Sequence, residues 1–350
     1  MNDQNRIGIL KDVKEELIRR TIEAYLSEEA PTRISIAERT KISATTVGKI
    51  FSALSSAGLA EEKRTTDKTT GRSCLQNTLG KNVVFAVLDL SSSIFTLSYF
   101  SGHRNCLLCL THEYDSSVTL YENIKLLLAR SAKSSRALHH LTTAVSVILA
   151  DPRFSASDFG GLSTSLFLPT EKDSGALIKM IEDIYGQVPI RFLESSIAFG
   201  LSLRYRAIGD HIKLPCAYIR FGRPTLAILY DESSAPLVLR PSGLLDHNCL
   251  PLGEFAQETA SVTEQSEYIM RTVNLIDCAA EPKTYVIETD SFRFNRDAAH
   301  AVTRAFAVTS SPLPEIITGH GAPSLLCFGA YCNTASEYLC DRLMKAKSTQ

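Results

Sequence analysis

The stretch "TKISATTVGKIFSALSSAGL", residues 40–59, constrains the fold more tightly than any other part of this chain. Its apolar residues recur at three- and four-residue spacing, which predicts a helix with one buried and one exposed face. These residues are Val47, Ile50, Phe51 and Leu54. Ser43 stands at the N-cap position and Gly58 just beyond the expected C-terminus, so we expect the helix over roughly 44–57.

The neighbouring segments extend this helix into a recognisable unit. Upstream, "ISIAERTKI" indicates a shorter helix capped by Ser35, followed by a tight turn over residues 41–43, and a longer apolar periodicity over 9–28 predicts a first helix. Downstream, "LAEEKRTT" and "GRSCLQNTL" flank the turn sequence "DKTTG" and predict a β-hairpin. Two helices joined by a tight turn, with a helix before them and a hairpin after them, predict a winged helix-turn-helix.

The charge of the chain is unevenly distributed, although its formal net charge is only −1. Residues 33–72 contain eight Lys or Arg and four Asp or Glu, a net charge of +4, and the remainder carries −5. Binding to nucleic-acid phosphates needs cations in one place only. A small basic module joined to a mildly acidic body is therefore consistent with a nucleic-acid reader that has a separate regulatory domain.

After residue 80 the helical periodicity gives way to short apolar runs that alternate with helical segments. Short apolar runs predict strands at "VVFAVLDL", "SIFTLSYF", "NCLLCLTHEY", "VPIRFLE", "CAYIRF" and "TLAILYD", with a further strand near 142–149. Helices are expected near 117–132 and 174–186, at "IAFGLSLRYRAI" and near 329–344. Hairpins followed by strands that alternate with helices predict a mixed α/β domain. We expect one domain over residues 1–80 and a second over 81–350.

Other features concern the cellular compartment. The longest apolar run, around "AVSVILA", is too short to cross a bilayer, so we expect a cytoplasmic protein without a membrane partner. Nine cysteines without a framework spacing are typical of reduced thiols. Cys106 and Cys109 in "CLLC" lie on an expected strand, where residues three apart point to opposite faces. We therefore expect buried core cysteines and no shared metal ion.

The segment "ISIAERTKISATTVGKIFSALSSAGLAEEKRTTDKTTGRSCLQNTL", followed at once by a strand ending in "VLDLSSS", resembles the ROK family of transcriptional regulators, the sugar-kinase-like repressors. The resemblance covers the rest of the chain mainly as an order of elements. It implies the α/β class, with an N-terminal winged helix-turn-helix followed by a two-lobed actin-like (ribonuclease H-like, ASKHA) ROK domain.

The phosphate-binding turns of the family's sugar kinases are altered in this chain. The DxGGT-like motif corresponds to "DLSSS", which keeps Asp89 but has Ser91 and Ser92 in place of glycines. Glycines are needed there because only a turn without side chains lets backbone amides surround the anion. The second, GTG-like turn corresponds to "FGRPT", with Arg223 and Pro224 where small residues are needed. Proline also removes a donor amide.

The catalytic and sugar-binding motifs are altered as well. The END-like motif corresponds to "LESS", so Ser196 follows Glu194 and Ser195 at the place of the catalytic aspartate. A serine of ordinary pKa does not take a proton from a sugar hydroxyl near neutral pH. The GExGH motif corresponds to "GLLDH", which keeps His247 and replaces the glutamate by Leu244. No counterpart of the family's cysteine-rich zinc motif follows, so we expect no metal, no cofactor and no catalytic residue.

The resemblance and the helix pattern together give candidate binding residues. For DNA, they are Ser43, Thr45, Thr46 and Lys49 around the leading turn of the second helix, and Arg64, Lys68 and Arg72 in the hairpin. For a ligand, they are Asp89, Glu194 and His247. Each has a structural alternative: Lys49 and Arg72 as solvated charges, Asp89 as the residue that holds a turn, and His247 as an ordinary core or surface histidine.

The sequence thus predicts a homodimeric regulator of double-stranded DNA, in the manner of a repressor, whose body has lost kinase activity and senses a carbohydrate or sugar phosphate. Two alternatives stay open. One is an active carbohydrate kinase with an appended DNA-binding domain, and the other is a regulator whose body only docks a protein.

Overall fold

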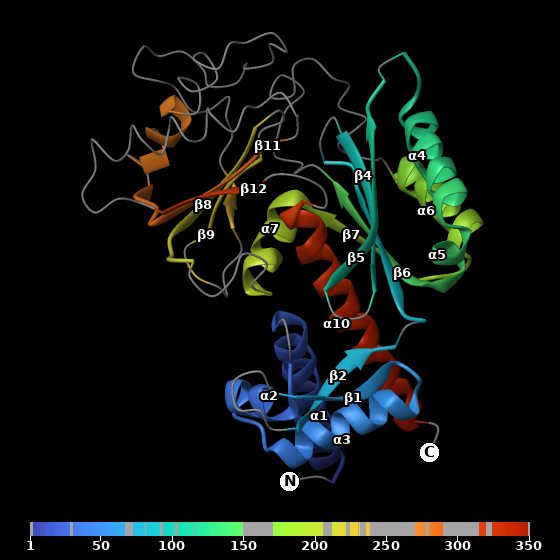
Figure 1. Ribbon diagram of the computed structural model, residues 1–350, viewed down its shortest axis with the longest axis vertical. Helices are drawn as coiled ribbons and strands as arrows, with labels where there is room; N and C mark the ends of the chain where they lie inside the picture. Colours follow the sequence, from blue (N-terminus) through green and yellow to red (C-terminus); the bar gives the residue numbers. More distant parts are fainter. Residues whose placement is uncertain are drawn as a thin grey trace.

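The computed structural model (Figure 1) describes the chain in separate segments. The described residues are 3–28, 31–66, 73–80, 82–91, 94–101, 104–115, 117–149, 171–205, 212–221, 225–229, 231, 236–238, 270–274, 276–277, 280–289, 315–319 and 324–348.

The N-terminal part has the three helices and the hairpin that the sequence predicts. The helices are α1 (Asp3–Ser27), α2 (Arg33–Thr40) and α3 (Ala44–Ser56), and the antiparallel strands are β1 (Ala60–Thr66) and β2 (Ser73–Leu79). The expected start of α2 was wrong. Thr32 is its N-cap, and Ser35 is the third helical residue, whose hydroxyl completes a capping box with Thr32. Val13, one of the apolar residues in the periodicity over 9–28 that predicted this helix, is exposed.

The body contains two five-stranded sheets with the same topology. The first is built from β3 (Val84–Asp89), β4 (Ile94–Ser101), β5 (Asn105–Glu113), β6 (Thr142–Leu149) and β7 (Ile190–Glu194). The second is built from β8 (Cys216–Phe221), β9 (Thr225–Leu229), β10 (Leu237–Val238), β11 (Thr284–Thr289) and β12 (Glu315–Gly319). In each sheet the strand that comes first in the chain is central, the next two extend antiparallel on one side, and the last two extend parallel on the other. This duplicated order confirms the two-lobed actin-like prediction.

The helices of the body cover the first sheet and fill the space between the sheets. Helices α4 (Leu120–Ser134), α5 (Arg136–Leu141) and α6 (Glu171–Tyr185) lie on the outer face of the first sheet, whereas α7 (Ser195–Arg204) and α10 (Leu325–Ser348) lie between the two sheets (Figure 1). The sequence did not predict α5, and it placed the start of α10 one turn too late. None of the helices in the described segments could cross a bilayer.

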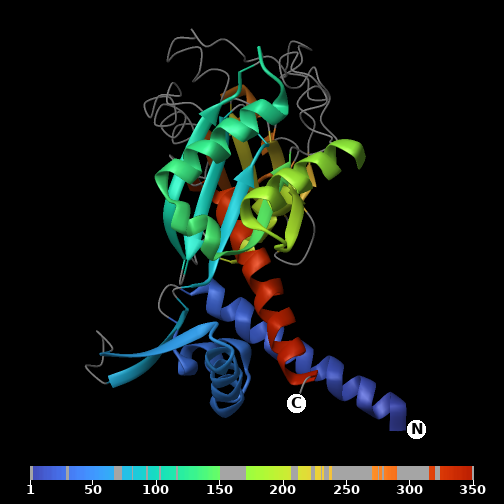
Figure 2. The ribbon, with the colours of Figure 1, turned by 90° about the vertical axis from the view of Figure 1, so that its right-hand side faces the viewer.

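Helix α10 connects the body to the N-terminal helices. It runs from the two sheets down to α1 and α3, as Figure 2 shows, and packs against α7, α1, β3 and β6. One hydrophobic cluster therefore contains Phe51 of α3, Phe85 of β3, Phe199 of α7 and Tyr331 of α10. Because the cluster is continuous, the winged helix is packed on the body and does not hang from a linker.

Candidate nucleic-acid interface and the junction of the two sheets

The outer face of α3 presents a polar stripe to solvent. Thr45, Lys49, Ser52 and Ser56 are exposed and recur at the spacing of one helix face. The opposite face is buried in the core through Val47, Ile50, Phe51 and Leu54. The stripe is therefore free to meet another surface while the buried residues fix the helix in place.

The cap of α3 separates the roles of the predicted residues. The Ser43 hydroxyl accepts a hydrogen bond from the Thr46 amide at 3.2 Å, and the hydroxyls of the two residues are 2.9 Å apart. Thr46 is half-buried, whereas Thr45 and Lys49 are exposed. Ser43 and Thr46 thus stabilise the first turn of α3, which leaves Thr45 and Lys49 as the more accessible of the predicted contact residues.

The hairpin that follows α3 forms the wing. Its two strands pair from Ala60 opposite Leu79 to Thr66 opposite Ser73, and Figure 2 shows them extending away from the helices. Arg64 lies on β1 opposite Leu75. Lys68, Arg72 and the side chain of Arg64 fall outside the described part of the chain.

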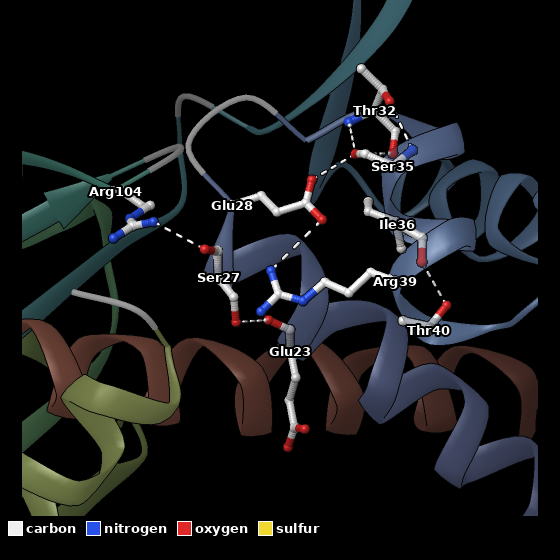
Figure 3. A network of polar contacts seen from close by, with 9 residues as sticks. All are labelled: Glu23, Ser27, Glu28, Thr32, Ser35, Ile36, Arg39, Thr40 and Arg104. Carbon is white, nitrogen blue, oxygen red and sulfur yellow. Dashed lines mark hydrogen bonds and ion pairs between the residues drawn. The ribbon is translucent and has the colours of Figure 1, made fainter. Parts of the chain in front are cut away.

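A chain of polar contacts joins the body to the helix-turn-helix (Figure 3). Arg104, in the turn between β4 and β5, donates a hydrogen bond from Nη1 to the Ser27 carbonyl at the end of α1 at 3.2 Å. Its guanidinium carbon also lies 4.6 Å from the ring centroid of Phe328 on α10. One side chain of the body thus contacts α1, the first helix of the winged helix-turn-helix, and α10, the helix of the body that packs against α1.

The contacts continue from the end of α1 into α2. The Glu28 carboxylate accepts a hydrogen bond from the Ser35 hydroxyl at 2.6 Å and forms an ion pair with Arg39 at 3.8 Å. From α1, Arg20 donates to the Thr40 carbonyl at 2.5 Å, at the point where α2 ends. Both ends of α2 are therefore attached to α1, and α1 is attached to the body.

At the other end of α10, a buried carboxylate from the first sheet is held by protein donors. Asp89 ends β3 and is fully buried. One carboxylate oxygen accepts from the Ser91 amide at 3.0 Å and the Ser91 hydroxyl at 2.5 Å, and the other accepts from the Ser324 hydroxyl at 3.4 Å. This geometry favours the structural alternative for Asp89, because its carboxylate holds the turn and contacts the start of α10.

A carboxylate from the second sheet reaches the same helix terminus. Glu288 of β11 accepts from the Leu325 amide at 2.9 Å and from the Tyr218 hydroxyl at 2.6 Å. A carboxylate at a helix N-terminus is stabilised by the unpaired amides and the helix dipole. Sequence reasoning missed Glu288 and Ser324; the local signal for Glu288 was one acidic residue within a run of strand-forming residues, "TYVIET".

The remaining predicted ligand residues are not brought together. Glu194 is half-buried at the N-cap of α7, where its side chain makes no cap hydrogen bond, and Ser196 in the first turn is fully buried. His247, Leu244, the "GRP" turn and Ser92 lie outside the described residues. The structure therefore places Asp89 at the end of β3 and Glu194 at the end of β7, with β6 between these two strands, and does not place His247.

The prediction for "CLLC" was wrong in two respects. Cys106 is exposed and Cys109 half-buried, so neither is a core cysteine. Pairing of β4 with β5 shifts between Tyr99 and Phe100, so that Phe100 pairs with Cys106 and Ser98 with Cys109. The shift is a β-bulge, and it places both cysteines on one face.

Comparison with known proteins identifies the fold. No protein-family model matches the chain, and no curated protein matches its sequence. Among solved structures, a ROK family transcriptional regulator described as a homolog of the E. coli MLC protein matches with a TM-score of 0.56 at 14% identity, over 96% of this chain and 98% of that one. An inorganic polyphosphate/ATP-glucomannokinase from Arthrobacter sp. strain KM matches with a TM-score of 0.51 at 14% identity, over 73% of this chain and 99% of that one. The chain has the fold of ROK proteins.

Proposed function

We propose that this protein is a DNA-binding transcriptional regulator of the ROK type whose body is not a sugar kinase. The observation that carries the proposal is a winged helix-turn-helix with an exposed polar stripe on α3. This unit precedes a duplicated actin-like body in the chain and packs against it. The match to a regulator over 96% of the chain supports it. The kinase match covers 73%, which leaves about a quarter of the chain without a counterpart. The division at residues 80 and 81 is part of the proposal.

In this function α3 is the helix that enters the major groove. Thr45 and Lys49 reach base edges, since they lie on the exposed stripe in the leading half of the helix. Ser43 and Thr46 position the helix through the cap that they form. The hairpin cations Arg64, Lys68 and Arg72 supply contacts with phosphates or a narrow minor groove. A single reading unit of this size favours a homodimer on two half-sites.

The body acts as a sensor of a carbohydrate or sugar phosphate in this proposal. Ser196 is fully buried where the family resemblance would place a base, and the Asp89 carboxylate is engaged by Ser91 and Ser324. A ligand that favours one arrangement of the two sheets would act on α10, whose first turn both sheets contact. Because α10 and Arg104 both contact α1, a movement of α10 would be transmitted to the winged helix-turn-helix.

The decisive experiment is selection of bound DNA from a random pool by the full-length protein, followed by affinity measurements on the selected site. A dimeric reader should select an inverted repeat whose half-site centres are about one helical turn apart, or a multiple of it. Lys49→Ala should lower the affinity by roughly 5- to 150-fold, the equivalent of about 1–3 kcal/mol, and alter sequence preference.

Lys125→Ala is the matched control, because Lys125 is an exposed lysine on α4 of the body and its loss changes the charge equally. Equal affinities of the two variants would contradict the placement of α3. A monomer in light scattering that binds one half-site would contradict the dimer. Sugar-dependent consumption of ATP by the purified protein would favour the kinase alternative.

A further inference from the structure

The edge strand β5 carries two cysteines that a bulge turns onto the same face. Ser98 and Phe100 of β4 lie two residues apart, so their side chains share a face, and they pair with Cys109 and Cys106, respectively. Leu107 is the extra residue and is exposed. Although the cysteines are three positions apart along the chain, they occupy positions that are neighbours on one face.

The surroundings of the two thiols are polar and differ in exposure. The Cys109 Sγ lies 3.2 Å from the Ser98 Oγ, and the Cys106 Sγ lies 3.4 Å from the Leu108 carbonyl oxygen. Cys106 is exposed and Cys109 is half-buried, and both are free thiols. Cys106 is therefore more accessible than Cys109 to a reagent in solution.

We infer that Cys106 and Cys109 form a dithiol site that a small disulfide, such as oxidised glutathione, converts into an intramolecular disulfide. The bulge at Leu107 brings the two cysteines to neighbouring positions on one face, and their thiols are close enough to share a hydrogen bond. A bridge within a single strand is strained, and strained disulfides are readily reduced again, which makes the modification reversible.

The hydrogen bond between the two thiols determines which of them reacts first. The Cys109 thiol, acting as donor, lowers the pKa of Cys106, whereas the same hydrogen bond, together with burial, raises the pKa of Cys109. A thiol with a lowered pKa is more often present as the attacking thiolate. Cys106 is thus the nucleophile and Cys109 the resolving thiol.

The reaction proceeds by two exchange steps. The Cys106 thiolate attacks one sulfur of oxidised glutathione, the S–S bond of glutathione breaks, and a glutathione thiolate leaves. Cys109 then loses its proton and attacks the Cys106 sulfur, which releases the second glutathione thiolate. The two cysteines lose two electrons, glutathione disulfide gains them, and the two protons are taken up by the released thiolates.

The test uses the reduced full-length protein, incubated with oxidised glutathione under native conditions, quenched with acid, alkylated and digested with trypsin. Cleavage after Arg104 and Lys125 yields one peptide that contains Cys106 and Cys109 and no other cysteine. We expect this peptide to lose two hydrogen atoms in mass and to carry no alkyl group. A peptide that stays doubly alkylated, or that carries two glutathiones, would overturn the inference.

Single variants distinguish the roles of the two thiols. Cys109→Ser should stop at a stable glutathione adduct on Cys106, because no resolving thiol remains. Cys106→Ser should acquire an adduct more slowly, since it keeps only the less accessible thiol. Equal rates of adduct formation in the two variants would refute the assigned order of attack. The mass readout is independent of DNA binding, so either result leaves the proposed function to its own test.

Discussion

The crossing of α7 and α10 depends on a residue without a side chain. A Cβ atom added at Gly329 would lie 2.1 Å from the Ala198 carbonyl oxygen and 2.6 Å from the Ser202 nitrogen, both in the backbone of α7. Backbone atoms cannot rotate away as a side chain can, so Gly329→Ala forces the two helices apart by roughly 1 Å in a closely packed interior. Overpacking costs about 1–3 kcal/mol and sometimes more, while alanine regains about 1 kcal/mol of helix propensity. Because backbone meets backbone here, we expect a net loss of about 2 kcal/mol or more.

Gly175 in α6 provides the matched control for this substitution. It is exposed, and an added Cβ would meet nothing within 4 Å, so Gly175→Ala should stabilise its helix by about 0.5–1 kcal/mol. Urea unfolding followed by circular dichroism measures both variants against the parent protein, with each resolved transition compared separately. An unchanged midpoint for Gly329→Ala would refute the close crossing of α7 and α10. A loss at Gly175 equal to that at Gly329 would show that the effect is not specific to the crossing.

Three further predictions concern local contacts. Burial lowers the pKa of His139, whose Nε2 lies 2.6 Å from the Ser131 Oγ, so the unfolded chain binds more protons below pH 6.5. Stability should therefore fall as the pH drops through 6.5, with a smaller slope in His139→Gln when midpoints are measured across pH; equal slopes would contradict this. Arg104→Ala should lower the free energy of unfolding, measured with urea, by about 1–3 kcal/mol through loss of its contacts with α1 and Phe328, and Arg104→Lys should recover little of it. Ser43→Ala should cost about 1 kcal/mol of stability by circular dichroism, and no change would argue against the cap.

The periodicity of apolar residues and the capping residues explain which parts of the winged helix-turn-helix could be predicted from the sequence. The bounds of α3 follow from its apolar periodicity and from Ser43 and Gly58, and Gly58 adopts the positive φ of 70° expected after a helix. At the start of α2, Thr32 and Ser35 are both hydroxyl residues that belong to one capping box. The sequence pattern predicted a capped start but assigned the cap to Ser35 and did not identify Thr32, because the choice between the two depends on backbone angles.

Contacts between distant segments could not be predicted in the same way. Glu288 meets Leu325 across 37 residues, and Ser324 meets Asp89 across 235. No periodicity or turn residue encodes such pairs, because they arise only when both sheets close on α10. The "CLLC" prediction failed for a related reason: the rule that alternate residues share a face holds only while the strand register is unbroken, and the bulge at Leu107 breaks it.

The position of α10 gives the proposed regulation a physical basis. A helix of 24 residues is about 36 Å long and behaves as one rigid element. Its first turn is held by carboxylates from both sheets, and its later turns, through Leu339 and Leu343, belong to the same core cluster as Ile18 and Ile22 of α1. If the angle between the two sheets changes, α10 must move as well. Otherwise the hydrogen bond between Asp89 and Ser324, or the one between Glu288 and the Leu325 amide, would break. Since α1 holds both ends of α2, such a movement reaches the helix-turn-helix through packed contacts alone.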